Sequence, residues 1–308
     1  MHNNSAPEIT VIICTYNTKV LTCECLDKLK QSIDYLGKSV ETIVVENGTD
    51  GTGDVIKEKY SWVKLLEPSG NTGFAKGNNL GIKTSNKNTK YYLFLNTDAL
   101  VKPDTLLKSV QFIERSKTCD VVGCRLRLGD GVIQSSGGYI PTPASICTWI
   151  WGIDLLPVIN FFLKPFHQKN MSFFNSDREV DWVMGAYLFM KREVVEKTKG
   201  FDENFFMYME EVEWCKRIKD AGFKIWYASS FEITHLDKTS SKNDSEKFRK
   251  IAQKEVLGVI YFLKKYYPNQ IYWVVPLIKA SLYLRVFAFG VLGNKMRKVG
   301  YLETIKAI

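Results

Sequence analysis

The segment YYLFLNTD, from Tyr91 to Asp98, decides the fold: five apolar residues run directly into an Asn, a Thr and an Asp. A short apolar run without alternation is typical of a strand buried on both faces of a parallel sheet. Three earlier runs share this character: Thr10–Cys14, Thr42–Val45 and Val63–Leu66. Helical segments fit between the runs, around Val20–Tyr35, Asp54–Tyr60 and Ala75–Thr84. This alternation predicts an α/β fold with a Rossmann-like, mostly parallel sheet flanked by helices.

Polar loops follow each of these runs, at the place where open α/β sheets bind their ligands. The four loops are Thr15–Asn17, Glu46–Gly51, Gly70–Asn79 and Asn96–Asp98. Turn formation alone would explain any one of them, but four together predict a binding site at one edge of the sheet. The glycine-rich loop matches neither the G-x-G-x-x-G fingerprint nor the P-loop signature. A Rossmann dehydrogenase and a P-loop NTPase are therefore disfavoured.

Asp98 is the first candidate for chemistry, because a carboxylate at the tip of an interior strand needs a partner or a cation. Carboxylate oxygens suit Mg²⁺ or Mn²⁺. The alternative is a turn or helix-capping role, although Asp104 lies nearer the next expected helix. His235, after an expected strand at Lys224–Ala228, is a second candidate ligand, and an ordinary structural histidine is its alternative.

Three carboxylates gather near the start of a helix expected over Phe206–Ala221: Glu210, Glu211 and Glu213. The helix dipole alone would favour negative charge there. In a site, one of them would act as a general base whose pKa is raised by burial. Since Glu211 points about 100° away from Glu210 on a helix, only one or two can face a given cleft. The others are expected to cap or pair.

Between Val121 and Phe174 the pattern loosens, and we expect a long connection or a lid there. Strand-like character returns at Val180–Met190. The seven cysteines are odd in number and form no C-x-x-C pair, which favours reduced thiols and a cytoplasmic location.

The net charge of +9 is concentrated in the last fifth of the chain. Residues 245–308 carry twelve Lys or Arg and three Glu, so the preceding residues are neutral overall. A basic segment of this kind meets either nucleic acid or anionic lipid. Aliphatic and aromatic residues alternate with the charges, which favours lipid and disfavours nucleic acid.

The stretch Ile271–Leu292 is apolar except for four residues, Pro276, Lys279, Ser281 and Arg285. It is long enough to span a bilayer, but its two central cations would each cost about 2.5–3.5 kcal/mol there. A helix lying in the interface lets both cations reach the headgroups. We therefore predict a catalytic domain over residues 1–244 and a helical, peripheral (monotopic) membrane region over 245–308, at the cytoplasmic face. A core helix and a homodimer contact are the alternatives.

Six segments together resemble the ordered signatures of glycosyltransferase family 2, most closely those of its rhamnosyltransferase-like branch. They are VIICTYN, VVENGTDGTGD, NTGFAKGNNLGI, LFLNTDALV, the stretch from Asp181 to Phe223, and ITHLDKTS. The resemblance spans roughly residues 8–241. It implies a GT-A fold, a nucleotide-sugar donor and inversion at the sugar carbon.

The resemblance also implies roles for individual residues. The donor would be bound by Thr15, Tyr16, Asn17, Glu46, Asn47, Gly73, Phe74, Lys76, Asn78, Asn96 and Thr97. Glu46 stands where the family usually has Asp. The DXD-like motif of the family is Asn96-Thr97-Asp98 here, so Asp98 would bind the metal, and His235 would complete the metal or diphosphate site. Glu211 occupies the position of the base, with Glu210 as the second candidate. The acceptor would contact Trp182, Gly185 and Ala186.

The function implied is an inverting transferase that needs Mg²⁺ or Mn²⁺. Its expected donor is dTDP-rhamnose, with UDP-sugars second, and its acceptor is an oligosaccharide or lipid-linked glycan, as in the synthesis of O-antigen or similar surface polysaccharide. A nucleotidyltransferase is an alternative, but it would want a basic glycine loop that VIICTYNTK does not supply. A non-catalytic scaffold that binds sugar nucleotides is the other alternative.

Overall fold

The computed structural model describes residues 6–116, 118–236 and 245–308. The chain forms two compact units, and each is described by itself. The first contains residues 6–137, 170–206 and 211–236, and the second contains residues 138–169, 207–210 and 245–308. The second unit thus includes the predicted C-terminal region together with a segment from the middle of the chain. The end of the segment ITHLDKTS, from residue 237 onward, lies outside the described residues.

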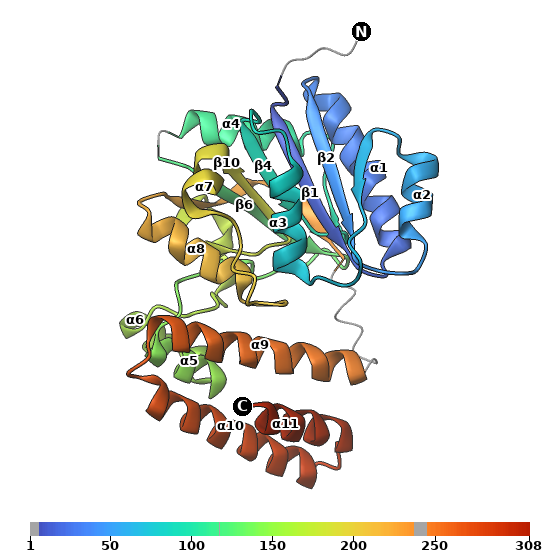
Figure 1. Cartoon of the computed structure of the whole chain (residues 1–308). Helices are drawn as coiled ribbons and strands as arrows, with labels where there is room; N and C mark the ends of the chain where they lie inside the picture. Colours follow the sequence, from blue (N-terminus) through green and yellow to red (C-terminus); the bar gives the residue numbers. More distant parts are fainter. Residues whose placement is uncertain (1–5, 117, 237–244) are drawn as a thin grey trace. The chain divides into compact units, whose positions relative to one another are not determined.

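A nine-stranded sheet forms the centre of the first unit, in the order β3-β2-β1-β4-β10-β6-β11-β5, with β8 paired to β11 (Figure 1). Its strands are β1 (Ile9–Thr15), β2 (Val40–Glu46), β3 (Val63–Leu66), β4 (Tyr91–Leu95), β5 (Ala99–Leu100), β6 (Val121–Leu128), β8 (Arg178–Val180), β10 (Tyr187–Lys191) and β11 (Ile225–His235). Strand β1 runs parallel to β2 and β4. Strand β10 lies antiparallel between β4 and β6. A separate pair joins β7 (Gly137–Gly138) to β9 (Trp182–Val183).

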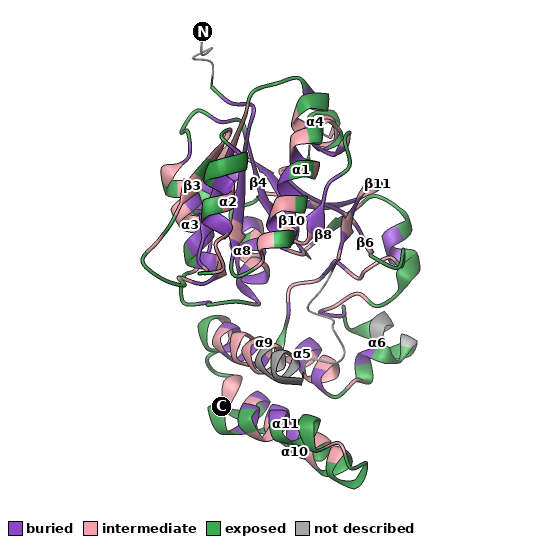
Figure 2. Ribbon diagram, turned by 90° about the vertical axis from the view of Figure 1, so that its right-hand side faces the viewer, coloured by how far each residue is buried: buried purple, intermediate pink, exposed green. Residues whose placement is uncertain are grey.

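The alternation expected for the first hundred residues is confirmed. The four apolar runs are β1 to β4, and the intervening helices are α1 (Lys19–Leu36), α2 (Thr52–Lys59) and α3 (Phe74–Thr84). Every residue of β4 is buried, and Figure 2 shows the central strands as the buried layer of this unit. Burial on both faces explains why these runs lack the alternation of a half-exposed strand.

Helices cover both faces of the sheet. On one face, Val11 and Leu93 belong to a core cluster with Leu26 of α1 and Leu106 of α4 (Thr105–Arg115). On the other face, the ring of Phe94 lies 5.2 Å from the ring of Trp214 in α8 (Glu210–Asp220). Helix α7 (Arg192–Thr198) and the short 3-10 helix η2 (Met171–Asn175) complete this unit. Successive residues of one strand therefore anchor opposite helical layers.

The structure corrects the expectation of a loose connection from Val121 onward. Residues Val121–Leu128 form β6, an interior strand between β10 and β11. Strand β6 continues into a tight hairpin, in which the Leu128 N–H donates to the Val132 carbonyl (2.8 Å) and Gly131 adopts φ +87°. In the second half of β6, Arg125 and Arg127 are only partly buried. The strand therefore lacks the continuous apolar run by which β1 to β4 were predicted.

Three further boundaries differ from expectation. The segment Val180–Met190 is divided among β8, β9 and β10. The helix expected from Phe206 begins at Glu210, because Tyr208 and Met209 adopt left-handed φ angles of 72° and 73°. Strand β11 runs seven residues beyond Ala228, across a bulge between Ala228 and Glu232. His235 is consequently the last residue of this strand and does not lie in a loop after it.

The second unit is helical in its described parts. It contains α5 (Pro143–Ile150), the 3-10 helix η1 (Ile153–Leu155), α6 (Pro157–Phe162), α9 (Ser245–Tyr266), α10 (Ile271–Val291) and α11 (Lys295–Ala307). Thr142 caps α5 by accepting a hydrogen bond from the Ser145 N–H, and the Ser145 hydroxyl accepts one from the Thr142 N–H. Helix α10 coincides with the apolar stretch Ile271–Leu292 that the sequence analysis expected to be helical.

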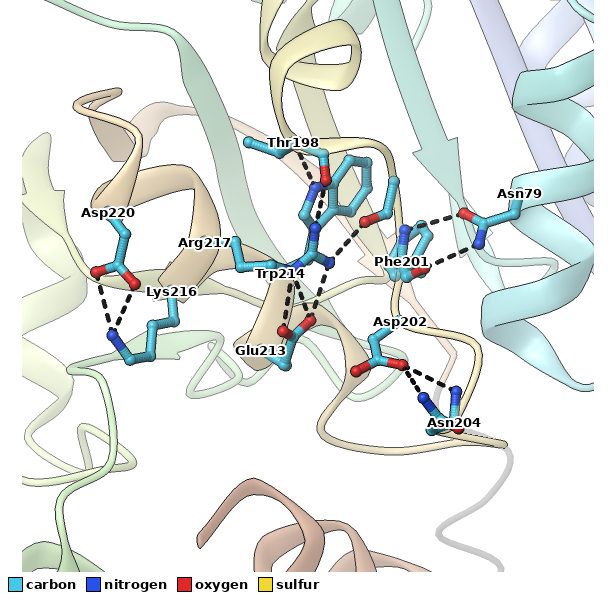
Figure 3. Close-up of polar contacts among 11 residues, drawn as sticks. Asn79, Thr198, Phe201, Asp202, Asn204, Glu213, Trp214, Lys216, Arg217 and Asp220 are labelled. Atoms are coloured by element: carbon cyan, nitrogen blue, oxygen red, sulfur yellow. Dashed lines mark hydrogen bonds and ion pairs between the residues drawn. The ribbon is translucent and has the colours of Figure 1, made fainter. Parts of the chain in front are cut away.

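A buried ion pair anchors α8 to the loop after α7 (Figure 3). The guanidinium of Arg217 donates to both carboxylate oxygens of Glu213, with Nε at 2.9 and 3.0 Å. Two further N–H groups of Arg217 donate to the carbonyls of Thr198 and Gly200. Trp214 adds a hydrogen bond from its indole N–H to the Thr198 hydroxyl (2.7 Å). Since Glu213 is fully buried, this network satisfies a charge that burial would otherwise penalise.

Replacing Arg217 by Met should lower the free energy of unfolding by about 3 kcal/mol, because the Glu213 carboxylate would stay buried without its partner. Lys216→Met is the matched control on the same helix: it removes a pair with Asp220, whose side chain is 57% exposed, and should cost less than about 1 kcal/mol. Urea unfolding followed by circular dichroism measures both. Equal losses in the two variants would contradict the anchoring role.

Candidate active site

The tips of the central strands meet at one edge of the sheet. Thr15, at the end of β1, pairs in parallel register with Glu46 at the end of β2. Leu95, the last residue of β4, pairs with Tyr187, the first residue of antiparallel β10. The loop after β4 and the residues before β10 therefore share this edge, which is where the sequence placed a site.

Hydroxyl groups connect the first and fourth strand tips. The Oγ1 atoms of Thr15 and Thr18 are 2.8 Å apart, and Thr18 donates to Thr97 at 3.3 Å. Thr22 joins the same chain, 2.9 Å from Thr15. The loop Asn96–Asp98 is thus tied to β1. Thr18 and Thr22 were not predicted, since threonines at the start of a helix carry no signal of their own.

Asn47 and Asn78 hold loops in place. The side-chain oxygen of Asn47 accepts from the N–H and the hydroxyl of Thr72 (3.2 and 2.8 Å), and its amide nitrogen lies 3.0 Å from Cys14 Sγ. Asn78, only 1% exposed, donates to the Phe74 carbonyl (2.9 Å). These amides are engaged within the protein, so they shape the glycine-rich loop, and a direct contact with the donor stays a prediction.

Glycine geometry brings the glycine-rich loop close to the chain before α8. Gly73 adopts φ +79°, and a Cβ there would meet the Phe206 carbonyl oxygen at 2.8 Å. The N–H of Phe74 donates to the same carbonyl (3.0 Å). Any other residue at this position would strain the backbone and push Phe206 away.

Glu46 offers a buried acceptor. One of its oxygens accepts from the Gly48 N–H, and the other, Oε2, is shielded from solvent and has no hydrogen-bond partner among the described residues. Burial raises the pKa of this carboxyl, the Gly48 hydrogen bond opposes the rise, and the charge of Asp50 adds to it. Asn17 stands beside it in a left-handed conformation (φ 52°) and accepts from the Thr49 N–H (2.8 Å). Tyr16 and Lys76 are exposed.

The structure brings Asp98 and His235 together from distant parts of the sequence. Asp98 Oδ1 lies 3.3 Å from His235 Nε2, and the backbone supports the pair, because the Leu236 N–H donates to the Asp98 carbonyl (2.8 Å). Asp104, and not Asp98, takes the N-cap position of α4.

The side chains of Asp98 and His235 are suited to bind a divalent cation whose remaining coordination positions are filled by a bound substrate. Two neighbouring ligands at about 2.1 Å from one octahedral ion are about 3.0 Å apart, close to the separation seen. Among the residues that the structure describes, no group of three or more His, Cys, Asp or Glu side chains gathers at one point. Mg²⁺ is commonly held by one or two carboxylates plus substrate phosphates, so a two-residue set of this kind would need phosphates or water to complete the shell.

Glu211 lies against the turn before β10. A Cβ placed on Gly185 would be 3.5 Å from the Glu211 Cβ, and the next carbonyl, that of Ala186, accepts from the Asn96 N–H (3.1 Å). Asn96 is two residues before Asp98, so Glu211 and the Asp98–His235 pair belong to the same edge of the sheet.

Desolvation raises the pKa of the Glu211 carboxyl. Hydrogen bonds from its own backbone N–H and from the backbone of Gly185 and Val212 oppose the rise. Its Oε2 atom has no hydrogen-bond partner within the described parts of the chain. Glu211 as a whole residue is half-buried. Glu210, the first residue of α8, is buried, whereas Glu213 pairs with Arg217. The expectation that some members of the cluster pair is thereby confirmed.

The three residues predicted to contact the acceptor differ in what they expose. Trp182 and Ala186 are 2% and 1% exposed, so their side chains offer little surface. Gly185 borders Glu211 directly. Their binding to an acceptor stays a prediction. Gln134, which contacts the ring of His235, was missed, because a lone glutamine in an irregular segment carries no signal.

Comparisons with known proteins show the family of the chain. Residues 6–252 match the model of the family described as "Glycosyltransferase like family 2". The chain is 23% identical to the rhamnosyltransferase WbbL of Escherichia coli, over 76% of this chain and 90% of that protein. It is 26% identical to an N-acetylglucosaminyl-diphospho-decaprenol L-rhamnosyltransferase of Mycobacterium tuberculosis, over 67% and 70% of the two chains. These relatives support the rhamnosyltransferase-like branch.

Among solved structures, the chain is similar to the mannosyltransferase PcManGT of Pyrobaculum calidifontis in complex with GDP-Man and Mn²⁺. The TM-score is 0.59 at 16% identity, and the match covers 99% of this chain and 87% of that one. This likeness confirms the GT-A-type fold. With the family match over residues 6–252, it follows that the chain belongs to glycosyltransferase family 2.

Proposed function

We propose that this glycosyltransferase is an inverting enzyme that depends on a divalent metal, Mg²⁺ or Mn²⁺. Its donor is a nucleotide sugar, with dTDP-rhamnose first and UDP-sugars second. Its acceptor is an oligosaccharide or lipid-linked glycan of a surface polysaccharide such as O-antigen, at the cytoplasmic face of a membrane. One observation carries the proposal: Glu211, whose Oε2 atom is shielded from solvent, and the Asp98–His235 pair lie at the same edge of the sheet, joined through the contact of Asn96 with Ala186. The names of the relatives support the choice of sugar and acceptor.

Glu211 is the general base of the proposed reaction. Its Oε2 takes the proton of the acceptor hydroxyl, while that hydroxyl oxygen forms a bond to the anomeric carbon of the donor sugar. The bond from that carbon to the diphosphate breaks on the opposite face, and the nucleoside diphosphate leaves with the electron pair. Asp98 and His235 would hold the cation, whose charge compensates the departing diphosphate. Burial suits Glu211 to this task, since a base with a raised pKa accepts a proton more readily.

Glu211→Gln should lower turnover by roughly 10²- to 10⁴-fold, the usual contribution of a general base, and leave nucleotide affinity nearly unchanged. Glu196→Gln, on the exposed surface of α7, is the control and should keep full activity. In the wild type, activity should fall as the pH drops through the pKa of Glu211, which burial places above that of an ordinary glutamate. Nucleoside diphosphate release across pH measures both effects. Near-wild-type turnover of Glu211→Gln would remove Glu211 from this role.

Asp98→Asn should abolish the gain in nucleotide affinity that Mn²⁺ gives the wild type, because an amide binds a divalent cation far more weakly than a carboxylate does. Asp104→Asn, at the start of α4 and distant in role, should retain the gain. Calorimetric titration of UDP and of dTDP, with Mn²⁺ and then with EDTA, makes the comparison. An Mn²⁺ effect of equal size in Asp98→Asn and the wild type would contradict the proposed metal site.

Helix α10 supports the proposed attachment to a membrane. It is the one helix in the described parts of the chain that is long and apolar enough to cross a bilayer, and only 22% of its most apolar window is buried. Its outer face exposes large apolar side chains, among them Tyr272 (82%), Phe287 (70%) and Val291 (73%). Figure 2 shows these exposed stretches along α10. A core helix would be mostly buried, so the core alternative is disfavoured.

Two polar residues of α10, Ser281 and Arg285, contact its own unit. The Ser281 hydroxyl donates to the Ile150 carbonyl at the end of α5 (2.9 Å), and the Arg285 guanidinium donates to the same carbonyl. Arg285 also lies over the ring of Tyr301. Arg285, one of the two central cations, is therefore held by contacts within the unit. Three exposed cations follow the helix, Lys295, Arg297 and Lys298, each worth about 1 kcal/mol beside anionic lipid.

The double substitution Leu284→Glu with Phe287→Glu should abolish binding to vesicles that contain anionic lipid, because both side chains belong to the exposed face of α10. Val20→Glu with Tyr35→Glu, two equally exposed residues of α1, adds the same charge elsewhere and should leave most of the binding intact. Sedimentation with vesicles at low and high salt measures the effect. Equal partitioning of both variants and the wild type would contradict membrane docking through α10, and a monomer–dimer shift confined to the α10 variant would assign the face to a second copy.

A further inference from the structure

Gln134 contacts the side of the His235 ring that faces away from Asp98. Its Oε1 atom lies 2.7 Å from His235 Nδ1, while Nε2 of the same ring lies 3.3 Å from Asp98 Oδ1. The three side chains come from the hairpin after β6, the end of β11 and the loop after β4. The imidazole is thus held between an amide oxygen and a carboxylate oxygen.

The chemistry of the amide oxygen decides which ring nitrogen carries the proton. An amide oxygen only accepts hydrogen bonds, so His235 Nδ1 must be the donor. A neutral imidazole has one N–H, so a proton on Nδ1 leaves the Nε2 lone pair available for a cation held beside Asp98. Without Gln134, the only acceptor of these two would be Asp98, and the proton would move to Nε2. A protonated Nε2 has no lone pair for a metal ion.

We propose that Gln134 is a positioning residue of the metal site: it fixes the tautomer of His235 so that Nε2 remains a ligand beside Asp98. This inference rests on the proposed function and deepens it. Partners of this kind are common around metal-binding histidines, and their loss usually costs about 10- to 100-fold in metal affinity or activity.

Backbone hydrogen bonds hold Gln134 in place beside His235. The Gln134 N–H donates to the Leu126 carbonyl in β6 (2.9 Å), and Leu126 pairs with Ile233 of β11 on the other side of the same strand. His235 lies two residues after Ile233, so the register of β6 fixes the separation of Gln134 and His235. The tight turn at Gly131, with φ +87°, sets that register.

The first measurement reads the tautomer itself. The chain has three histidines, so the ring nitrogens of His235 can be assigned in a ¹⁵N NMR spectrum by comparison with His235→Ala. The wild type should show a protonated Nδ1 at a pH where the ring is neutral. Gln134→Leu, which keeps the bulk and removes the acceptor, should shift the proton to Nε2. Gln134→Glu, whose carboxylate accepts from Nδ1, should restore the wild-type tautomer.

The second measurement reads metal affinity through the signal of free Mn²⁺ in electron paramagnetic resonance, with saturating UDP and, separately, dTDP. Gln134→Leu should weaken Mn²⁺ binding about 10- to 100-fold, and Gln134→Glu should stay close to the wild type. Gln111→Leu on α4 is the matched control and should have no effect. In the His235→Ala background, adding Gln134→Leu should not lower the Mn²⁺ affinity further. If Gln134 only stabilised the local structure, the second substitution would lower the Mn²⁺ affinity again.

The outcomes separate this inference from the proposed function. An unchanged tautomer, or equal Mn²⁺ affinity of Gln134→Leu and the wild type, would overturn the role of Gln134 while leaving transfer activity and the metal site in place. The proposed function alone would be overturned if the wild type binds Mn²⁺ and Gln134→Leu shifts the tautomer as expected, but the wild type releases no nucleoside diphosphate from any donor.

Discussion

The antiparallel insertion of β10 beside β4 is the constraint on which the candidate site depends. Buried strands must pair their backbone groups, and β10 satisfies those of β4 while running in the opposite direction. The residues before β10 therefore lie at the edge where β4 ends. The hydrogen bond from the Asn96 N–H to the Ala186 carbonyl extends this pairing past the strand. It joins the loop of Asp98 to the turn against which Glu211 packs.

The carboxylates of α8 have different properties because they have different partners. Glu213 is matched by Arg217 and two backbone carbonyls accept from the same guanidinium, so its charge is balanced and serves to anchor the helix. Glu211 receives backbone hydrogen bonds that offset its burial only in part, and its pKa stays raised. One helix thus supplies both a structural anion and the candidate proton acceptor. The difference comes from their partners, since the residue type is the same.

In the second unit, it is a positive charge, that of Arg285, that needs partners. An arginine within an apolar helix would be costly in hydrocarbon, and Arg285 is turned toward the C-terminal carbonyl of α5, where positive charge is favourable. The same contact satisfies a carbonyl that a helix end leaves unpaired. Helix α10 can therefore present an apolar face although its sequence is interrupted by cations.

The sequence by itself determined the first half of the sheet and the family. Continuous apolar runs indicate burial on both faces directly. The loop Asn96–Asp98 and the carboxylates of Glu210–Glu213 were found from their places in the motifs. It could not show β6, whose half-exposed residues break the run, nor the left-handed residues that delay α8 until Glu210.

Only the tertiary structure decided which side chains meet. The contact of Asp98 with His235 spans more than a hundred residues and depends on the bulge that lets β11 continue to His235. Gln134 reaches the same ring from a hairpin whose turn sets the register. Periodicity encodes which face of an element is buried, whereas pairing between distant strands depends on register. Register is set by bulges and turns that leave little trace in a single sequence.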